Sequence, residues 1–137
     1  MRVVFDASSI VGAALKAGST PMRALRAAPA YDTIVISVPV LAEIGDVLHR
    51  PKFVASIPAD RRAHVLEALT GAAEWFDPVA AITDCADPND NKYLDLALAA
   101  ATEIVVSSDR HLFGMHPWRG VMILRPADHV ALRQSVP

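Results

Sequence analysis

The chain alternates short, wholly apolar segments with segments of helical spacing, and this alternation restricts the folds that it can adopt. Apolar runs predict strands at 2–6, 33–38, 103–109 and 120–126. Helices are predicted at 9–18, 22–28, 39–50, 58–76, 90–102 and 127–134, with Pro51 following the end of the third. Strands that are apolar along their whole length and are separated by helices are typical of a parallel sheet covered on both faces. We therefore expect a three-layer α/β/α fold around a central parallel sheet of four to five strands.

The length and composition set further limits. A chain of 137 residues that is 53% hydrophobic has the size of one compact domain, so we expect a single domain over 1–137. The one cysteine, Cys85, has no partner for an internal disulfide. Neither a signal sequence nor a membrane-spanning run is recognisable, which favours a cytoplasmic protein without a membrane partner. Since the net charge is only −2, a nucleic acid would have to bind a local basic patch.

Acidic residues fall where a parallel sheet would bring them together. Ligands of such sheets bind beyond the carboxyl ends of the strands. Asp6 ends the first predicted strand, and Asp109 ends a later one. Glu43 lies in the first turns of the helix after the second strand, and Asp90 begins the helix that leads to the strand of Asp109. We expect these four acids to converge at one edge of the sheet.

Each of these residues also has an ordinary structural explanation. Asp6 and Asp90 could be helix N-caps, for which Asp is a favoured residue. Glu43 could be a solvated helix residue, and Ser107 and Asp109 could form hydrogen bonds within a turn. These explanations together require four independent acids to meet at one edge by accident. A bound cation explains the cluster better, because neighbouring carboxylates repel each other unless a cation or a shared proton compensates.

The residue types favour a hard divalent cation. Mg²⁺ and Mn²⁺ take oxygen ligands and are commonly held by one or two carboxylates together with a substrate phosphate. One or two such ions can activate a water and stabilise the leaving oxygen of a phosphodiester. Zinc is not indicated, because cysteine occurs once and the five histidines are scattered. We expect His49, His111 and His116 to lie at the surface or behind the ligands.

Three segments also resemble the successive motifs of PIN-domain proteins, namely VVFDASSIVGA at 3–13, VPVLAEIGDVLHRPKF at 38–53 and DPNDNKYLDLALAAATEIVVSSDRHLF at 87–113. The resemblance covers 2–132 and is strongest to the VapC-like toxin components of toxin–antitoxin systems. It implies a PIN-like fold and a metal-dependent endoribonuclease that cleaves single-stranded or loop RNA. It also implies a cognate antitoxin protein as a partner.

The resemblance implies roles for individual residues. The catalytic set would be Asp6, Glu43, Asp90 and Asp109, and the metal ligands would be Asp6, Asp90 and Asp109. Ser8 stands where many relatives have Asn, and Ser107 where many have Thr. Both serines could hold a ligand or a metal-bound water by hydrogen bonds.

The third motif departs from the family pattern. Many relatives have an acid at position 91, where this chain has Asn91 directly after Asp90. Either of the two could face the metal. Asp95 lies one helical turn beyond Asn91 and could approach the same face or be a solvated helix residue. Asp87 reads as part of the Asp-Pro-Asn turn that begins the helix.

Candidates for substrate contacts surround the predicted edge. Basic residues that could bind RNA phosphates are Lys92 and Arg110 foremost, with Arg50, Lys52 and Arg119. Trp118, Tyr93 and Phe113 could stack on bases, although Tyr93 and Phe113 occupy apolar positions that favour the core. The Ala- and Leu-rich helix surfaces indicate a homodimer or a groove for the antitoxin.

Two other functions stay open at this point. A catalytically inert PIN-like module could bind RNA or protein, and Asn91 keeps that alternative open. An aspartate-based phosphatase or receiver-like domain also places an Asp after its first strand. Against the latter, position 8 is Ser rather than Asp, and the late strand ends in Ser-Ser-Asp-Arg without the expected Lys.

Overall fold

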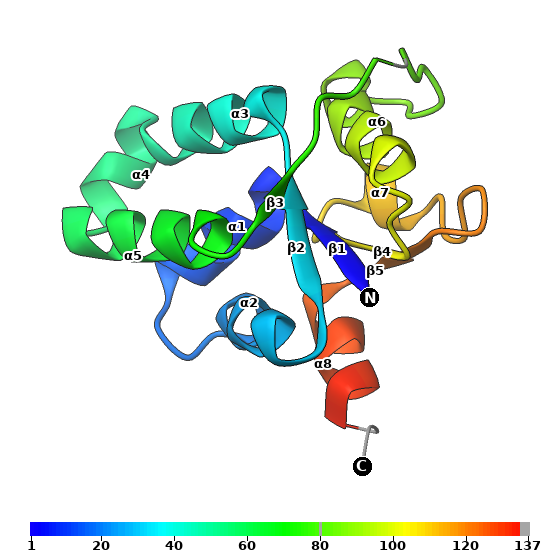
Figure 1. Ribbon diagram of the computed structural model, residues 1–137. Coiled ribbons are helices and arrows are strands. Elements are labelled where there is room, and N and C mark those ends of the chain that lie inside the picture. Colours follow the sequence, from blue (N-terminus) through cyan, green and yellow to red (C-terminus); the bar gives the residue numbers. More distant parts are fainter. Residues whose placement is uncertain (80, 135–137) are drawn as a thin grey trace.

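Five parallel strands form the central sheet, in the order β3-β2-β1-β4-β5 (Figure 1). The computed structural model describes residues 1–79 and 81–134. The strands are β1 Arg2–Phe5, β2 Thr33–Ile36, β3 Glu74–Trp75, β4 Ile104–Val106 and β5 Met122–Leu124. Every pairing in the sheet is parallel. The predicted α/β class and the parallel sheet of four to five strands are confirmed.

Helices cover both faces of this sheet. Successive strand residues point to opposite faces, and Val3, Val4 and Phe5 are all at most 2% exposed, so each face of β1 is covered. The helices are α1 Ala7–Leu15, α2 Thr20–Tyr31, α3 Val38–Leu48, α4 Pro51–Ser56, α5 Ala59–Thr70, α6 Asn91–Ala99, α7 Arg110–Phe113 and α8 Pro126–Gln134, with the 3₁₀ turn η1 Pro88–Asp90. Among the described helices, none has the length and apolar character needed to cross a membrane.

The segment predicted as one helix at 58–76 divides into two elements. Helix α5 ends at Thr70, and the edge strand β3 follows and pairs with β2. The two strand residues, Glu74 and Trp75, are both exposed, so no buried apolar pattern marks them in the sequence. The prediction that the helix continues to position 76 is therefore wrong.

Two short helices are absent from the predictions. Pro51 was expected to end the preceding helix, but it instead begins α4 at a position where proline is well tolerated. Helix α7 has only four residues, and the Asp109 side chain caps it by accepting a hydrogen bond from the His111 N–H at 2.8 Å. A single turn of this length leaves no helical periodicity in the sequence.

The carboxyl ends of β1 and β4 lie side by side. Phe5 pairs with Val106, and the Asp6 N–H donates to the Val106 carbonyl at 3.1 Å. Asp6 caps α1 by accepting from the Ser9 N–H. The backbone therefore turns into α1 beside the point where β4 ends, which places the side chains of these two turns at a common edge.

Candidate active site

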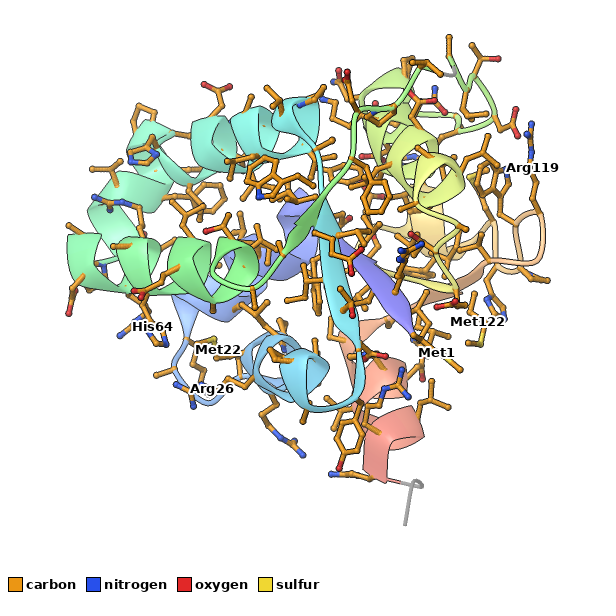
Figure 2. The ribbon with its side chains drawn as sticks, in the orientation of Figure 1. Met1, Met22, Arg26, His64, Arg119 and Met122 are labelled. Carbon is orange, nitrogen blue, oxygen red and sulfur yellow. The ribbon has the colours of Figure 1, made fainter. Side chains whose placement is uncertain are left out.

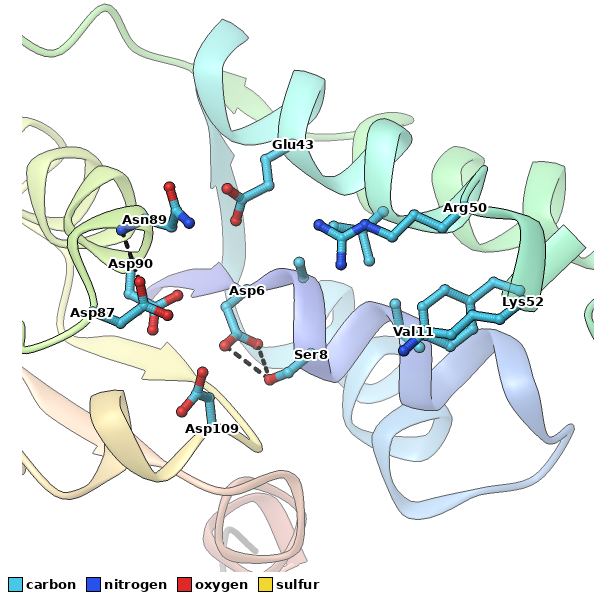
Figure 3. Close-up of a pocket in the computed structure, with 13 residues that line it drawn as sticks. Asp6, Ser8, Val11, Glu43, Arg50, Lys52, Asp87, Asn89, Asp90 and Asp109 are labelled. Carbon is cyan, nitrogen blue, oxygen red and sulfur yellow. Dashed lines mark hydrogen bonds between the residues drawn. The ribbon is translucent and has the colours of Figure 1, made fainter.

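A pocket of about 450 Å³ lies at this edge of the sheet (Figure 3). Five carboxylates line it, and they belong to Asp6, Glu43, Asp87, Asp90 and Asp109. All four acids that were expected to converge are among them. Figure 3 shows Asp87, Asp90 and Asp109 on one side, with Asp6 and Ser8 in the middle and Arg50 and Lys52 on the other side.

Hydroxyl and amide donors surround the Asp6 carboxylate, which is 2% exposed. Ser107 Oγ donates to Oδ2 at 2.5 Å, the Ser9 N–H donates to Oδ1 at 2.9 Å, and Ser8 Oγ lies 2.8 and 2.9 Å from the two oxygens. Burial raises the pKa of Asp6, and the hydrogen bonds from Ser107, Ser9 and Ser8 oppose that rise. These donors fix the orientation of the carboxylate in the pocket.

A group of four side chains has the arrangement needed to hold a metal ion. Oxygens of Asp87, Asp90 and Asp109 and a ring nitrogen of His111 all lie within 4.8 Å of one another. Asp90 Oδ2 is buried and has no hydrogen-bond partner in the described residues. A buried carboxylate oxygen without a partner is costly unless a cation compensates. The group therefore fits a cation.

The electrostatics of Asp90 point the same way. Burial, followed by the charges of Asp109, Asp87 and Asp6, raises the pKa of Asp90 to about 7. A divalent cation between these groups would reverse that effect and favour the ionised form. Three carboxylates and one imidazole offer mostly oxygen ligands, a set suited to Mg²⁺ or Mn²⁺.

Glu43 lines the pocket but lies outside the group of four. Its Oε1 accepts a hydrogen bond from the Tyr93 hydroxyl at 2.6 Å, and its Oε2 forms an ion pair with Lys92. The Tyr93 oxygen in turn accepts from the Ala7 N–H at 3.1 Å. Tyr93 is therefore a core residue, as its apolar position indicated, and it joins α1, α3 and α6. Lys92, expected at the substrate, contacts Glu43.

Asn91 and Asp95 face the loop that precedes η1, and they do not line the pocket. The Cys85 N–H donates to Asn91 Oδ1 at 2.9 Å, and the Ile82 N–H donates to Asp95 Oδ1 at 2.7 Å. Each side chain thus satisfies a backbone donor of the loop. Arg110 is exposed and is also not among the residues that line the pocket.

Asp87 and His111 have a larger place in the site than sequence reasoning assigned to them. Asp87 forms the expected turn by accepting from the Asn89 N–H at 3.0 Å, and it also belongs to the possible metal group. Asp87 and Asp90 lie three residues apart on either end of the short turn, a spacing that is visible in the sequence. His111 is exposed, as expected, and its Nδ1 lies 3.1 Å from Asp109 Oδ1.

Comparisons with known proteins agree with this fold. A sequence model described as PIN domain matches residues 2–111. The fold is similar to that of PAE2754 from Pyrobaculum aerophilum, with a TM-score of 0.64 and 15% identity, over 98% of this chain and 91% of the other. It is also similar to VapBC2 from Rickettsia felis bound to a DNA fragment from their promoter, with a TM-score of 0.58 and 19% identity, over 90% and 97% of the two chains. No curated protein gave a significant match.

Proposed function

The chain belongs to the PIN-domain family, and from that premise we propose that it is a Mg²⁺- or Mn²⁺-dependent endoribonuclease. The reaction is hydrolysis of phosphodiester bonds in single-stranded or loop RNA. The observation that carries the proposal is the buried, unpartnered Oδ2 of Asp90 within the group of Asp87, Asp109 and His111. One or two ions would provide the counter-charge that this group lacks.

The acids of the pocket and His111 would hold the ion. Asp90 and Asp109 would hold the ion, with Asp6 beside them and Asp87 and His111 completing the group. A bound ion would lower the pKa of a water molecule and would provide positive charge that stabilises the leaving oxygen of the phosphodiester.

The other side chains orient these acids and position the substrate. Ser8 and Ser107 fix the Asp6 carboxylate, and Tyr93 fixes Glu43, which would act as the fourth catalytic acid. Lys92 and Arg110 would approach the RNA backbone, Lys92 after release from Glu43.

We further propose that the enzyme acts as a VapC-like toxin in the cytoplasm, restrained by a cognate antitoxin and assembled as a homodimer. The proposal is supported by the order of the motifs and by a fold shared with VapBC2. A small gene that overlaps or precedes this one is the expected genomic sign. Light scattering of the purified protein tests the dimer.

Cleavage of a mixed-sequence single-stranded RNA tests the nuclease function. The purified protein is assayed with Mn²⁺, with Mg²⁺ and with EDTA, beside Asp6→Asn and Asp109→Asn. The matched control is Asp128→Asn, which removes an exposed carboxylate that pairs with Arg125 outside the pocket. We expect cleavage that requires metal, is lost in the two pocket variants and persists in the control. Equal activity in the wild type and both pocket variants would mean contamination, and an inert RNA-binding module would then be the better description.

A further inference from the structure

The pocket has a basic end opposite its carboxylates. Arg50 and Lys52, at the junction of α3 and α4, line the same cavity as Asp6 and Asp109, and Figure 3 shows both side chains extending toward it. Val47 and Phe53 line the cavity near these two residues, and Lys52 Nζ lies 4.8 Å from the centroid of the Phe53 ring. One cavity therefore offers a site for cations at one end and a site for anions at the other.

These two cations have no carboxylate partner in the described part of the chain, although five carboxylates line the same pocket. Some other basic side chains do form ion pairs, as Lys92 does with Glu43 and Arg119 does with Asp84. Both side chains are exposed, so their charges are available to a ligand in the pocket.

We infer that Arg50 and Lys52 bind the phosphate next to the scissile one. This inference rests on the proposed nuclease function and identifies the substrate as a polynucleotide that crosses the pocket. A ligand with a single phosphate can satisfy only one end of the cavity. A nucleic-acid strand can place one phosphate at the ion and a neighbouring phosphate between Arg50 and Lys52. Each end of the cavity then holds a phosphate of the same strand, provided that the cleaved bond lies inside the strand.

The first test measures binding of a fluorescein-labelled, mixed-sequence single-stranded RNA in EDTA, as a function of salt. The variants are Arg50→Gln, Lys52→Gln and the double variant. The matched control is Arg26→Gln, an exposed arginine that lines a different cavity with His64 (Figure 2). The slope of log K against log salt concentration should fall by about 0.7 for each phosphate contact removed from a single strand. The control should keep the wild-type slope.

The second test locates the phosphate. After the cleavage site has been mapped with Mn²⁺, each flanking phosphate is replaced in turn by a neutral methylphosphonate. One of these replacements should raise KM in the wild type, leave kcat nearly unchanged and have no effect in the double variant. Mn²⁺ affinity, measured by titration, should be the same in the double variant as in the wild type.

The results of these two tests distinguish the phosphate-binding inference from the proposed nuclease function. If the wild type cleaves RNA but Arg50→Gln and Lys52→Gln match Arg26→Gln in salt slope and KM, this inference is overturned and the nuclease function stands. If the wild type cleaves nothing while the salt slope still depends on Arg50 and Lys52, these residues bind an RNA phosphate, but the nuclease function fails and with it the assignment of that phosphate beside a scissile one.

Discussion

Lowering the pH from 8 to 5 without divalent cations should stabilise the wild-type protein relative to Asp90→Asn. Burial, together with the charges of Asp109 and Asp87, raises the pKa of Asp90 to about 7 from an ordinary value of 3.8. The folded protein therefore takes up a proton at Asp90 at a pH where the unfolded chain is still ionised. Asparagine has no proton to gain, so the variant lacks this contribution.

The size of the effect follows from the pKa. Because the folded-state pKa is raised, the contribution of Asp90 to stability is complete below 3.8 and is lost as the pH rises through about 7. At pH 5 the solution is two units below the folded pKa, and each unit is worth about 1.36 kcal/mol. The free energy of unfolding of the wild type should thus gain about 2.7 kcal/mol over the variant between pH 8 and pH 5.

Urea denaturation followed by circular dichroism measures this difference. Both proteins are unfolded in EDTA at several values between pH 5 and pH 8, and the wild-type minus variant free energy is compared at each pH. Carboxylates that do not interact with Asp90 are common to both proteins and cancel in the difference. At pH 8, saturating Mn²⁺ should make the free energy of unfolding of the wild type larger than that of the variant, because the ion binds the ionised wild-type site more strongly. Parallel pH curves for the two proteins would refute the argument.

Two substitutions test the contacts that hold the fold around the site. Tyr93→Phe removes the hydroxyl that donates to Glu43 and accepts from the Ala7 N–H. The free energy of unfolding in urea should therefore fall by about 1–3 kcal/mol. An unchanged urea midpoint would show that the hydroxyl contributes nothing to stability. Arg133→Ala leaves the buried Asp32 carboxylate without its main partner and should cost about 3–5 kcal/mol in the same assay. A loss below about 1 kcal/mol, the usual value for an exposed pair, would contradict the burial of that pair.

The sequence allowed much of the sheet and the convergence of the acids to be predicted, for a simple geometric reason. Strand β4 is apolar along its whole length and β1 is apolar after Arg2. Asp6 follows β1 directly, and Asp109 follows β4 within a short turn. In a parallel sheet, residues at these positions must meet at one edge. The strand β3 was missed because its two residues, Glu74 and Trp75, are exposed at the sheet edge and have no apolar pattern.

The contacts within the site could not be predicted from spacing. The ion pair of Lys92 with Glu43 joins residues 49 positions apart in sequence. It depends on how closely α3 and α6 pack, which no local pattern records. The hydrogen bond from the Cys85 N–H to Asn91 likewise depends on the path of the loop before η1. Tertiary contacts of this kind decide which of several neighbouring polar residues turns toward the pocket.

The attachment of that loop to α6 has a mechanical consequence. Asn91 and Asp95, four residues apart on the helix, each hold a backbone N–H of the loop that leads to Asp87. Asp90 lies directly before the first residue of the same helix. A small shift or rotation of α6 would therefore move the loop, the turn and the helix together, so that Asp87 and Asp90 keep their separation while their distance from Asp109, at the start of α7, changes.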